Sequence, residues 1–207
     1  MFKSTKIIEL GSCAFRQPSA ESHCKYLHGY RLTAKFWFEA ESLDQNNWVV
    51  DFGGLKELKN TLQNQFDHTT CISKEDPRLD EFNRLQQAGV CDLRVMDGVG
   101  IEKFAEWCYG TANRHVHELT NSRCKCVKVE VFEHESNSAI YEPTNKPTLG
   151  DQELTDFMGN KDVQEPPMNV APRETAPVVS KTNISSNSNK LKNKWVNPDA
   201  PKNSWLF

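Results

Sequence analysis

The sequence predicts an α+β fold with an antiparallel sheet, and three observations support this expectation. Several stretches alternate apolar and polar residues with a period of two, which is typical of half-buried strands. Others repeat apolar residues every three or four positions, which is typical of amphipathic helices. The order along the chain is strand pair, helix, helix, strand pair. Because parallel sheets show a regular strand–helix alternation that is missing here, we expect antiparallel pairing with two helices on one face.

The first strand pair is expected at residues 2–10 and 30–40. Whether the earlier strand continues to Phe15 stays open. The later strand alternates clearly, so one of its faces is expected to be buried. That apolar face consists of Leu32, Ala34, Phe36 and Phe38.

Two helices are expected next, over residues 54–66 and about 101–119. In the first, leucine and phenylalanine recur at intervals of three and four residues, which places them on one face. Residues 76–96 between the helices are irregular, with a candidate helix at 77–88. A connection of this length is more often functional or specific to a family than a plain linker.

The second strand pair is expected at residues 126–133 and 138–141. The chain then changes character near residue 146. All seven cysteines and all six histidines precede that point, and seven of the ten prolines follow it. We therefore predict a folded domain at 1–145 and a mostly disordered tail at 146–207 that is rich in Asn, Ser, Lys and Pro.

The tail contains Trp195 and ends with the aromatic segment 203–207. Exposed aromatic side chains can anchor a protein partner or another subunit. The alternative is that this tip lies loosely on its own domain. Both interpretations stay open.

Composition excludes several functional classes. The chain has 25 Lys and Arg against 28 Asp and Glu, a net charge of -3, which argues against nonspecific nucleic-acid binding. No apolar run approaches the roughly 18 residues of a membrane span, and the N-terminus lacks the apolar stretch of a signal peptide. We therefore expect a cytoplasmic protein with reduced thiols and no membrane partner.

Three polar clusters are candidates for chemistry. Cys24 lies between His23 and Lys25, and such neighbours can help a thiol to become a thiolate. Asp67 precedes His68 just after the first helix, where a carboxylate can orient an imidazole. Glu133 ends a strand, where a carboxylate can hold a guanidine-like ligand edge by two hydrogen bonds. The alternatives are a buried core thiol, ordinary helix-end capping and a solvated strand end.

Taken in order, these clusters resemble the 6-pyruvoyl-tetrahydropterin synthase and 6-carboxy-tetrahydropterin synthase family. The resemblance covers about residues 5–142. Each motif is weak by itself, and the specificity comes from five of them in the right order. The motifs are Cys24-x-x-x-His28-Gly29, Val49-Val50-Asp51-Phe52 with Leu55-Lys56, Phe66-Asp67-His68, Ile101-Glu102 with Ala105-Glu106-Trp107, and Val129-Glu130-Val131 leading to Glu133 and to Ile140-Tyr141.

The resemblance implies a tunnelling fold (T-fold), in which three subunits close a barrel of strands and two trimers stack into a hexamer. It implies a site between subunits that holds a pterin ring. Cys24 matches the catalytic thiol, and Asp67 with His68 matches a proton-relay pair. Glu133 matches the carboxylate that anchors the pterin and relays protons, and Glu102 is a second candidate substrate-binding residue.

The sequence departs from the family at the zinc ligands. The family binds zinc with three histidines, one on the first strand and two in a His-Gly-His. Here that motif reads His28-Gly29-Tyr30, and the first-strand position falls near Phe15. Only His28 remains, whereas a catalytic zinc site normally takes three protein ligands. His23 and Cys13 are candidate substitutes, and zinc as a cofactor stays open.

Three functions follow from these observations. The first is a lyase of the 6-carboxy-tetrahydropterin synthase type, which acts on 7,8-dihydroneopterin triphosphate in queuosine or 7-deazaguanine precursor synthesis. The loss of two zinc ligands favours a second function, a zinc-free T-fold protein that binds a pterin or a purine. The third is an oligomeric scaffold that presents its aromatic-tipped tails.

Overall fold

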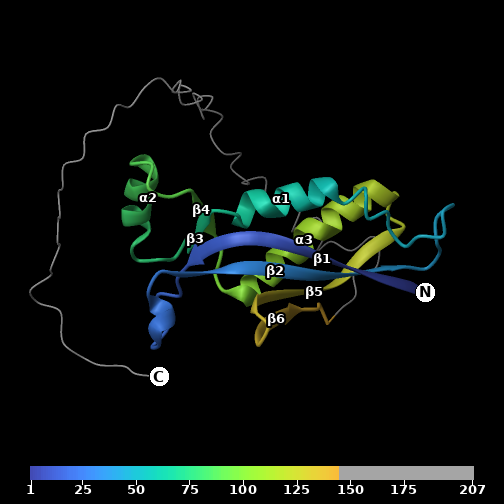
Figure 1. Cartoon of the computed structure of the whole chain (residues 1–207). Coiled ribbons are helices and arrows are strands. Elements are labelled where there is room, and N and C mark those ends of the chain that lie inside the picture. The colour runs from blue at the N-terminus through green and yellow to red at the C-terminus, as the bar shows by residue number, and fades with distance from the viewer. Residues whose placement is uncertain (145–207) are drawn as a thin grey trace, which may run out of the picture. The chain divides into compact units, whose positions relative to one another are not determined.

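The computed structural model describes residues 1–144. The expected tail at 146–207, with its aromatic docking segment, lies outside the described residues. In the described part the chain forms one sheet with the strand order β4-β3-β1-β2-β5-β6 (Figure 1). The strands are β1 (Phe2–Phe15), β2 (His28–Ala40), β3 (Thr69–Ser73), β4 (Leu93–Met96), β5 (Cys124–His134) and β6 (Asn137–Tyr141). The helices are the short 3-10 helix η1 (His23–Lys25), α1 (Lys56–Phe66), α2 (Leu79–Gln87) and α3 (Ile101–Thr120).

The four expected strands and both expected main helices are confirmed, and β1 runs to Phe15. The candidate helix within the irregular segment is confirmed as α2. Two strands were not expected. β3 pairs with β1, and β4 pairs with β3, both in parallel. The α+β class is therefore right, while the sheet is mixed, because only β1, β2, β5 and β6 form antiparallel pairs.

One face of the sheet is covered by α1 and α3, which lie along the same side of it (Figure 1). Phe66 of α1 packs edge-on against Phe104 and Trp107 of α3, with ring centroids 5.1 and 5.5 Å apart. Such aromatic pairs add about 0.5–1.5 kcal/mol each beyond the apolar area they bury. The main buried residues of the two helices are Leu58, Leu62, Phe66, Phe104, Ala105, Cys108, Ala112 and Val116.

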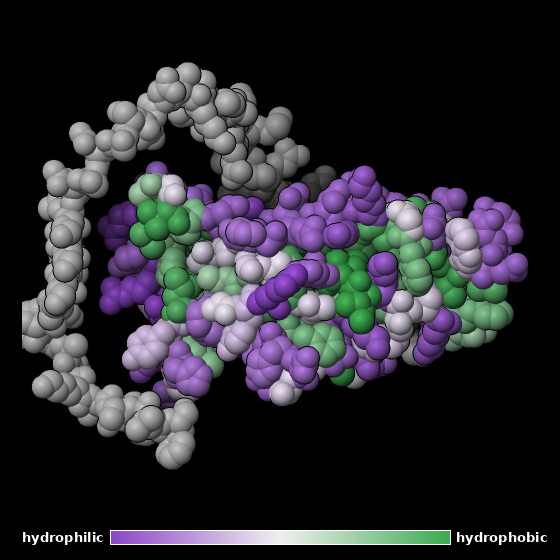
Figure 2. All heavy atoms as spheres, in the orientation of Figure 1, coloured by the Kyte–Doolittle hydropathy of each residue, from purple (hydrophilic) through white to green (hydrophobic). Residues whose placement is uncertain are grey.

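α2 packs on the opposite face of β3. Neighbouring residues of a strand point to opposite faces, and Cys71 belongs to the main core while Ile72 packs with Phe82 and Leu93. β3 is therefore buried on both sides, which explains why its sequence does not alternate. Figure 2 shows apolar side chains gathered over α2, where Leu85 is 40% exposed.

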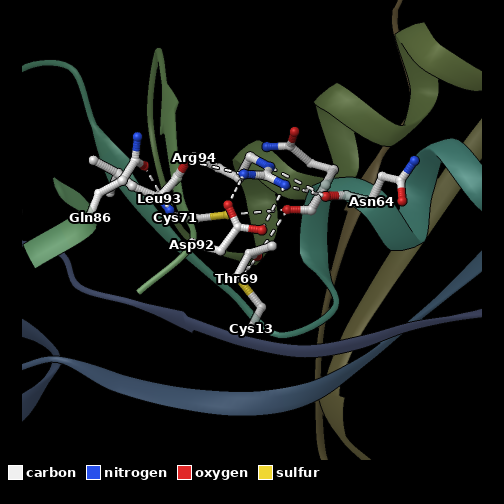
Figure 3. A network of polar contacts seen from close by, with 9 residues as sticks. Cys13, Asn64, Thr69, Cys71, Gln86, Asp92, Leu93 and Arg94 are labelled. Atoms are coloured by element: carbon white, nitrogen blue, oxygen red, sulfur yellow. Dashed lines mark hydrogen bonds and ion pairs between the residues drawn. The ribbon is translucent and has the colours of Figure 1, made fainter. Parts of the chain in front are cut away.

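A polar network holds the parallel part of the sheet to α1 (Figure 3). The guanidinium of Arg94 donates from Nε and Nη2 to the carbonyl oxygen of Asn64, at 3.3 and 3.0 Å, and pairs with Asp92. Thr69 donates to the Gln65 carbonyl oxygen at 2.9 Å, and its hydroxyl lies 3.9 Å from the sulfur of Cys13. Cys13 is thus buried at the β1–β3 junction.

Within residues 1–144, no helix is long and apolar enough to cross a membrane.

Candidate functional site

A cavity of about 340 Å³ opens where three parts of the fold meet. The end of β1 contributes one wall, the N-terminus of α3 a second, and the end of β5 with the β5–β6 turn a third. It is lined by Phe15, Gln17, Gly100, Ile101, Glu102, Glu133, Ser136, Asn137 and Ser138. The two residues that the sequence assigns to substrate binding, Glu102 and Glu133, therefore lie in one cavity.

Gly100 shapes this cavity by its backbone. It caps α3 with a φ of +116°, a conformation that side-chain-bearing residues rarely adopt. A Cβ atom there would lie 2.7 Å from Nε2 of Gln17 and 3.3 Å from Oε2 of Glu102. No side chain caps the helix, so the N–H groups of its first turn stay available as donors. The cavity thus offers carboxylate acceptors beside backbone donors.

An aromatic cluster lies at the edge of the cavity. Phe15 of β1 is paired with His28 of β2, and their ring centroids are 4.8 Å apart. Tyr30 lies two residues further on the same face, 6.1 Å from Phe15 and 5.7 Å from His28. His134 at the end of β5 lies 6.3 Å from Tyr30.

The resemblance assigns the three zinc positions of the family to this cluster, but its residues do not fit zinc. Nδ1 of His28 is 2.7 Å from the Tyr26 carbonyl oxygen, which leaves one ring nitrogen free to ligate. Phe15 has no donor atom. His23 and Cys13 do not complete a set, because residues 1–144 hold no group of three or more His, Cys, Asp or Glu placed to bind a metal.

Cys24 lies in η1, just outside the cluster. The N–H of Gln17 donates to its carbonyl oxygen at 2.9 Å, and its own N–H donates to Oγ of Ser22 at 3.3 Å. Its thiol is partly exposed. Desolvation raises the pKa of Tyr30, and the charges of Glu133 and Cys24 raise it further. Tyr30 thus links Cys24 and Glu133 electrostatically.

Asp67 and His68 form the second part of the predicted site. Nδ1 of His68 lies 2.9 Å from Oδ1 of Asp67, which also accepts the Ser12 N–H at 3.1 Å. The N–H of His68 donates to the Ser12 carbonyl oxygen at 2.8 Å. Gly11, at a bulge of β1 with a φ of +103°, makes the approach of Asp67 feasible. The pair is well exposed, with 85% of the His68 side chain open to solvent.

The subunit does not bring this pair together with Cys24 and Glu133. Asp67 is close enough to Arg31 and Glu9 to influence their pKa values, although the Glu9–Arg31 hydrogen bond dominates both shifts. Within residues 1–144, the side-chain contacts of Asp67 join it to Ser12 and His68, so the pair and the cavity are separate parts of one subunit.

Sequence reasoning missed Gln17, Gly100 and the turn residues 136–138 as parts of the cavity. The sequence could have indicated Gly100, since a glycine directly before a helix often marks a special backbone conformation. No sequence pattern indicates that the turn residues line a cavity. They reach the cavity only because the β5–β6 hairpin ends beside the N-terminus of α3.

The sequence profile of the family described as 6-pyruvoyl tetrahydropterin synthase matches residues 9–144, well over half of the chain. The chain belongs to the 6-pyruvoyl tetrahydropterin synthase family. This membership accounts for the order of the motifs and for the α+β T-fold. It leaves the particular activity of this member of the family open.

Individual relatives are distant. The chain is 32% identical to the 6-carboxy-5,6,7,8-tetrahydropterin synthase of Rickettsia bellii over 80 residues, which are 38% of this chain and 57% of that protein. The chain thus spans little more than half the length of this relative. The synthase of the same name from Bacillus subtilis is 23% identical over 142 residues, 69% of this chain and 86% of that protein. An uncharacterized protein of Wolinella succinogenes shares the fold, with a TM-score of 0.59 at 19% identity, covering 68% of this chain and 97% of that one.

Proposed function

We propose that this member of the family binds a pterin or purine ring in the cavity through Glu133, without a bound zinc ion. The observation that carries the proposal is the convergence of Glu133 and Glu102 in one cavity of about 340 Å³. Pterins and guanine share an edge with an amino group beside a ring N–H. A carboxylate matches these two donors with its two oxygens, and such charge-assisted pairs are stronger than neutral hydrogen bonds.

The size of the cavity supports a ring of this class. Small-molecule sites have volumes of about 300–1,000 Å³. Phe15 lines the cavity from an almost fully buried position, and the donors at the start of α3 complement a ring carbonyl oxygen. Glu133 would therefore fix the edge of the ring while the cavity walls fix its plane.

We further propose that two subunits complete each site. Neither Asp67 nor His68 lines the cavity of its own subunit, so a second copy would have to bring its pair there. The sheet face away from α1 and α3 carries exposed apolar side chains that association would bury, among them Ile7 and Ile140, which are 61% and 51% exposed. Burial of apolar area at about 25 cal/mol per Å² favours such an assembly. A trimeric or hexameric barrel of the family type fits this arrangement.

Binding of pterin and guanine to the purified full-length protein, followed by calorimetry, tests the proposal. We expect saturable binding in wild type and a loss of about tenfold or more in Glu133→Gln, because a hydrogen bond to a charged group contributes roughly 1.5–3 kcal/mol. Glu135→Gln is the matched control, since Glu135 is an exposed carboxylate two residues away. Wild type that binds neither ring, or equal affinity in Glu133→Gln, would contradict the proposal.

A second candidate is the lyase reaction on 7,8-dihydroneopterin triphosphate. The presence of a partly exposed Cys24 thiol, with the Asp67–His68 pair held against β1, favours it. In that reaction Cys24 would move a proton at the substrate side chain, and a second subunit's pair would relay it. Product formation from this substrate that is lost in Cys24→Ala would support the lyase; an inactive protein that still binds the ring would exclude it.

A further inference from the structure

The charge of the cavity is negative. Among the described residues that line it, two are carboxylates and none is Lys or Arg. The basic residues next to lining residues in the sequence are already paired with other carboxylates. Arg16 lies 3.2 Å from the buried carboxylate of Asp76, and Lys103 lies 2.6 Å from Glu106. Neither ammonium nor guanidinium group is therefore available to neutralise a ligand anion.

Among the described parts of the lining, the N-terminus of α3 supplies the partial positive charge, beside neutral side-chain donors such as Gln17 and Asn137. A helix N-terminus is equivalent to roughly half a positive charge. Glu102 is itself a residue of this first turn. Glu102 and Glu133 carry two formal negative charges, so within one subunit the carboxylates outweigh the helix and the lining of the cavity repels anions.

The neighbouring aromatic cluster also disfavours an anionic ligand. Where the family holds a metal ion, this chain places the rings of Phe15, His28 and Tyr30 within 6.1 Å of one another. Phe15 is almost fully buried. A divalent cation offsets the charge of a phosphorylated side chain, and a ring of carbon atoms does not. This corner of the site suits an apolar or uncharged group.

We propose that the cavity selects an unphosphorylated pterin or purine, with a short neutral substituent against the aromatic cluster, and discriminates against the triphosphate. This inference rests on the proposed function, because it specifies the ligand of the same cavity. Lys25 of η1 is the basic side chain closest in sequence to the candidate thiol. Its ammonium lies over the ring of Tyr26, 5.4 Å from the centroid, and we assign it no role in ligand binding.

The test compares neopterin with neopterin triphosphate, and guanosine with guanosine triphosphate, on the full-length assembled protein in about 0.15 M salt. We expect each triphosphate to bind about tenfold or more weakly than its unphosphorylated partner. The difference should shrink at about 1 M salt, where charges are screened beyond roughly 3 Å. Use of the assembled protein includes any charge that a second subunit contributes.

Three variants locate the effect. Glu102→Gln should bring the two affinities closer, because it removes one of the repelling charges. Glu118→Gln is the matched control with the same charge change on an exposed position of the same helix, about 24 Å away at 1.5 Å per residue, and should leave the ratio unchanged. Lys25→Ala should also leave it unchanged.

The possible failures are distinguishable. Triphosphates that bind as tightly as the unphosphorylated compounds, or more tightly, would overturn this inference and leave the proposed ring-binding function intact. Loss of that tight binding in Lys25→Ala would show that η1 supplies the missing cation. A protein that binds none of the four compounds would overturn the proposed function itself.

Discussion

The two parts of the site are built in different ways, although β1 contributes to both. Backbone atoms hold the Asp67–His68 pair, through both the N–H and the carbonyl oxygen of Ser12 and through the bulge at Gly11. Side chains alone make the aromatic cluster of Phe15, His28 and Tyr30. Exchange of one flat ring for another leaves the pairing of β1 with β2 intact. The fold therefore constrains the first part strongly and lets the chemistry of the second part change.

This comparison predicts that zinc binding can be restored by side chains alone. Phe15→His combined with Tyr30→His would place three imidazoles at the cluster, which is the ligand number of a catalytic zinc site. We expect about one zinc per subunit and an affinity at least about 1,000-fold above wild type, because zinc sites contribute many kcal/mol once their ligands are in place. Metal content by mass spectrometry and a zinc titration measure the effect.

The single variants are the controls, since each supplies only two imidazoles and should bind zinc far more weakly than the double variant. Thermal unfolding shows whether an imidazole at the buried Phe15 position is tolerated. A folded double variant with no more zinc than wild type would show that the backbone of this part has changed as well. The comparison drawn above would then be wrong.

The backbone contacts of the Asp67–His68 pair predict that one added methyl group strongly lowers the stability of the fold. A Cβ atom at Gly11 would lie 2.2 Å from Oδ1 of Asp67, and the φ of +103° is itself strained for alanine. We expect Gly11→Ala to lower the free energy of unfolding by about 3 kcal/mol. Gly89→Ala is the control, because Gly89 has a φ of +71° but no atom within 4 Å of the added carbon. It should cost about 1 kcal/mol. Equal costs in denaturant unfolding would contradict a specific contact with Asp67.

The same contrast explains what the sequence could predict. Leu58, Leu62 and Phe66 repeat with the helical period, so α1 followed from the pattern, and β2 followed from its alternation. The sequence pattern did not predict β3 and β4. They are only five and four residues long and are buried mainly by tertiary contacts, so they show no detectable period. The convergence of Glu102 with Glu133 was expected only through the family resemblance, because residues 31 positions apart meet through the packing of α3 beside β5.

A smaller effect tests how dry the core between α3 and β5 is. Cys126 of β5 and Cys108 of α3 are fully buried, and burial raises the pKa of the Cys126 thiol to about 12 from an ordinary value of 9.0. The folded state therefore keeps this proton where the unfolded state loses it. The resulting stability is complete below pH 9 and is lost as the pH rises from 9 towards 12.

Denaturant unfolding at pH 8.5 and pH 10.0 measures this effect. We expect wild type to lose about 1 kcal/mol more than Cys126→Ala between the two values, since each pH unit contributes about 1.36 kcal/mol per group. Val129→Ala is the control, because it shortens a buried side chain of the same strand without removing a titrating group, and it should follow wild type. An identical pH dependence in Cys126→Ala would mean that water reaches the core between α3 and β5.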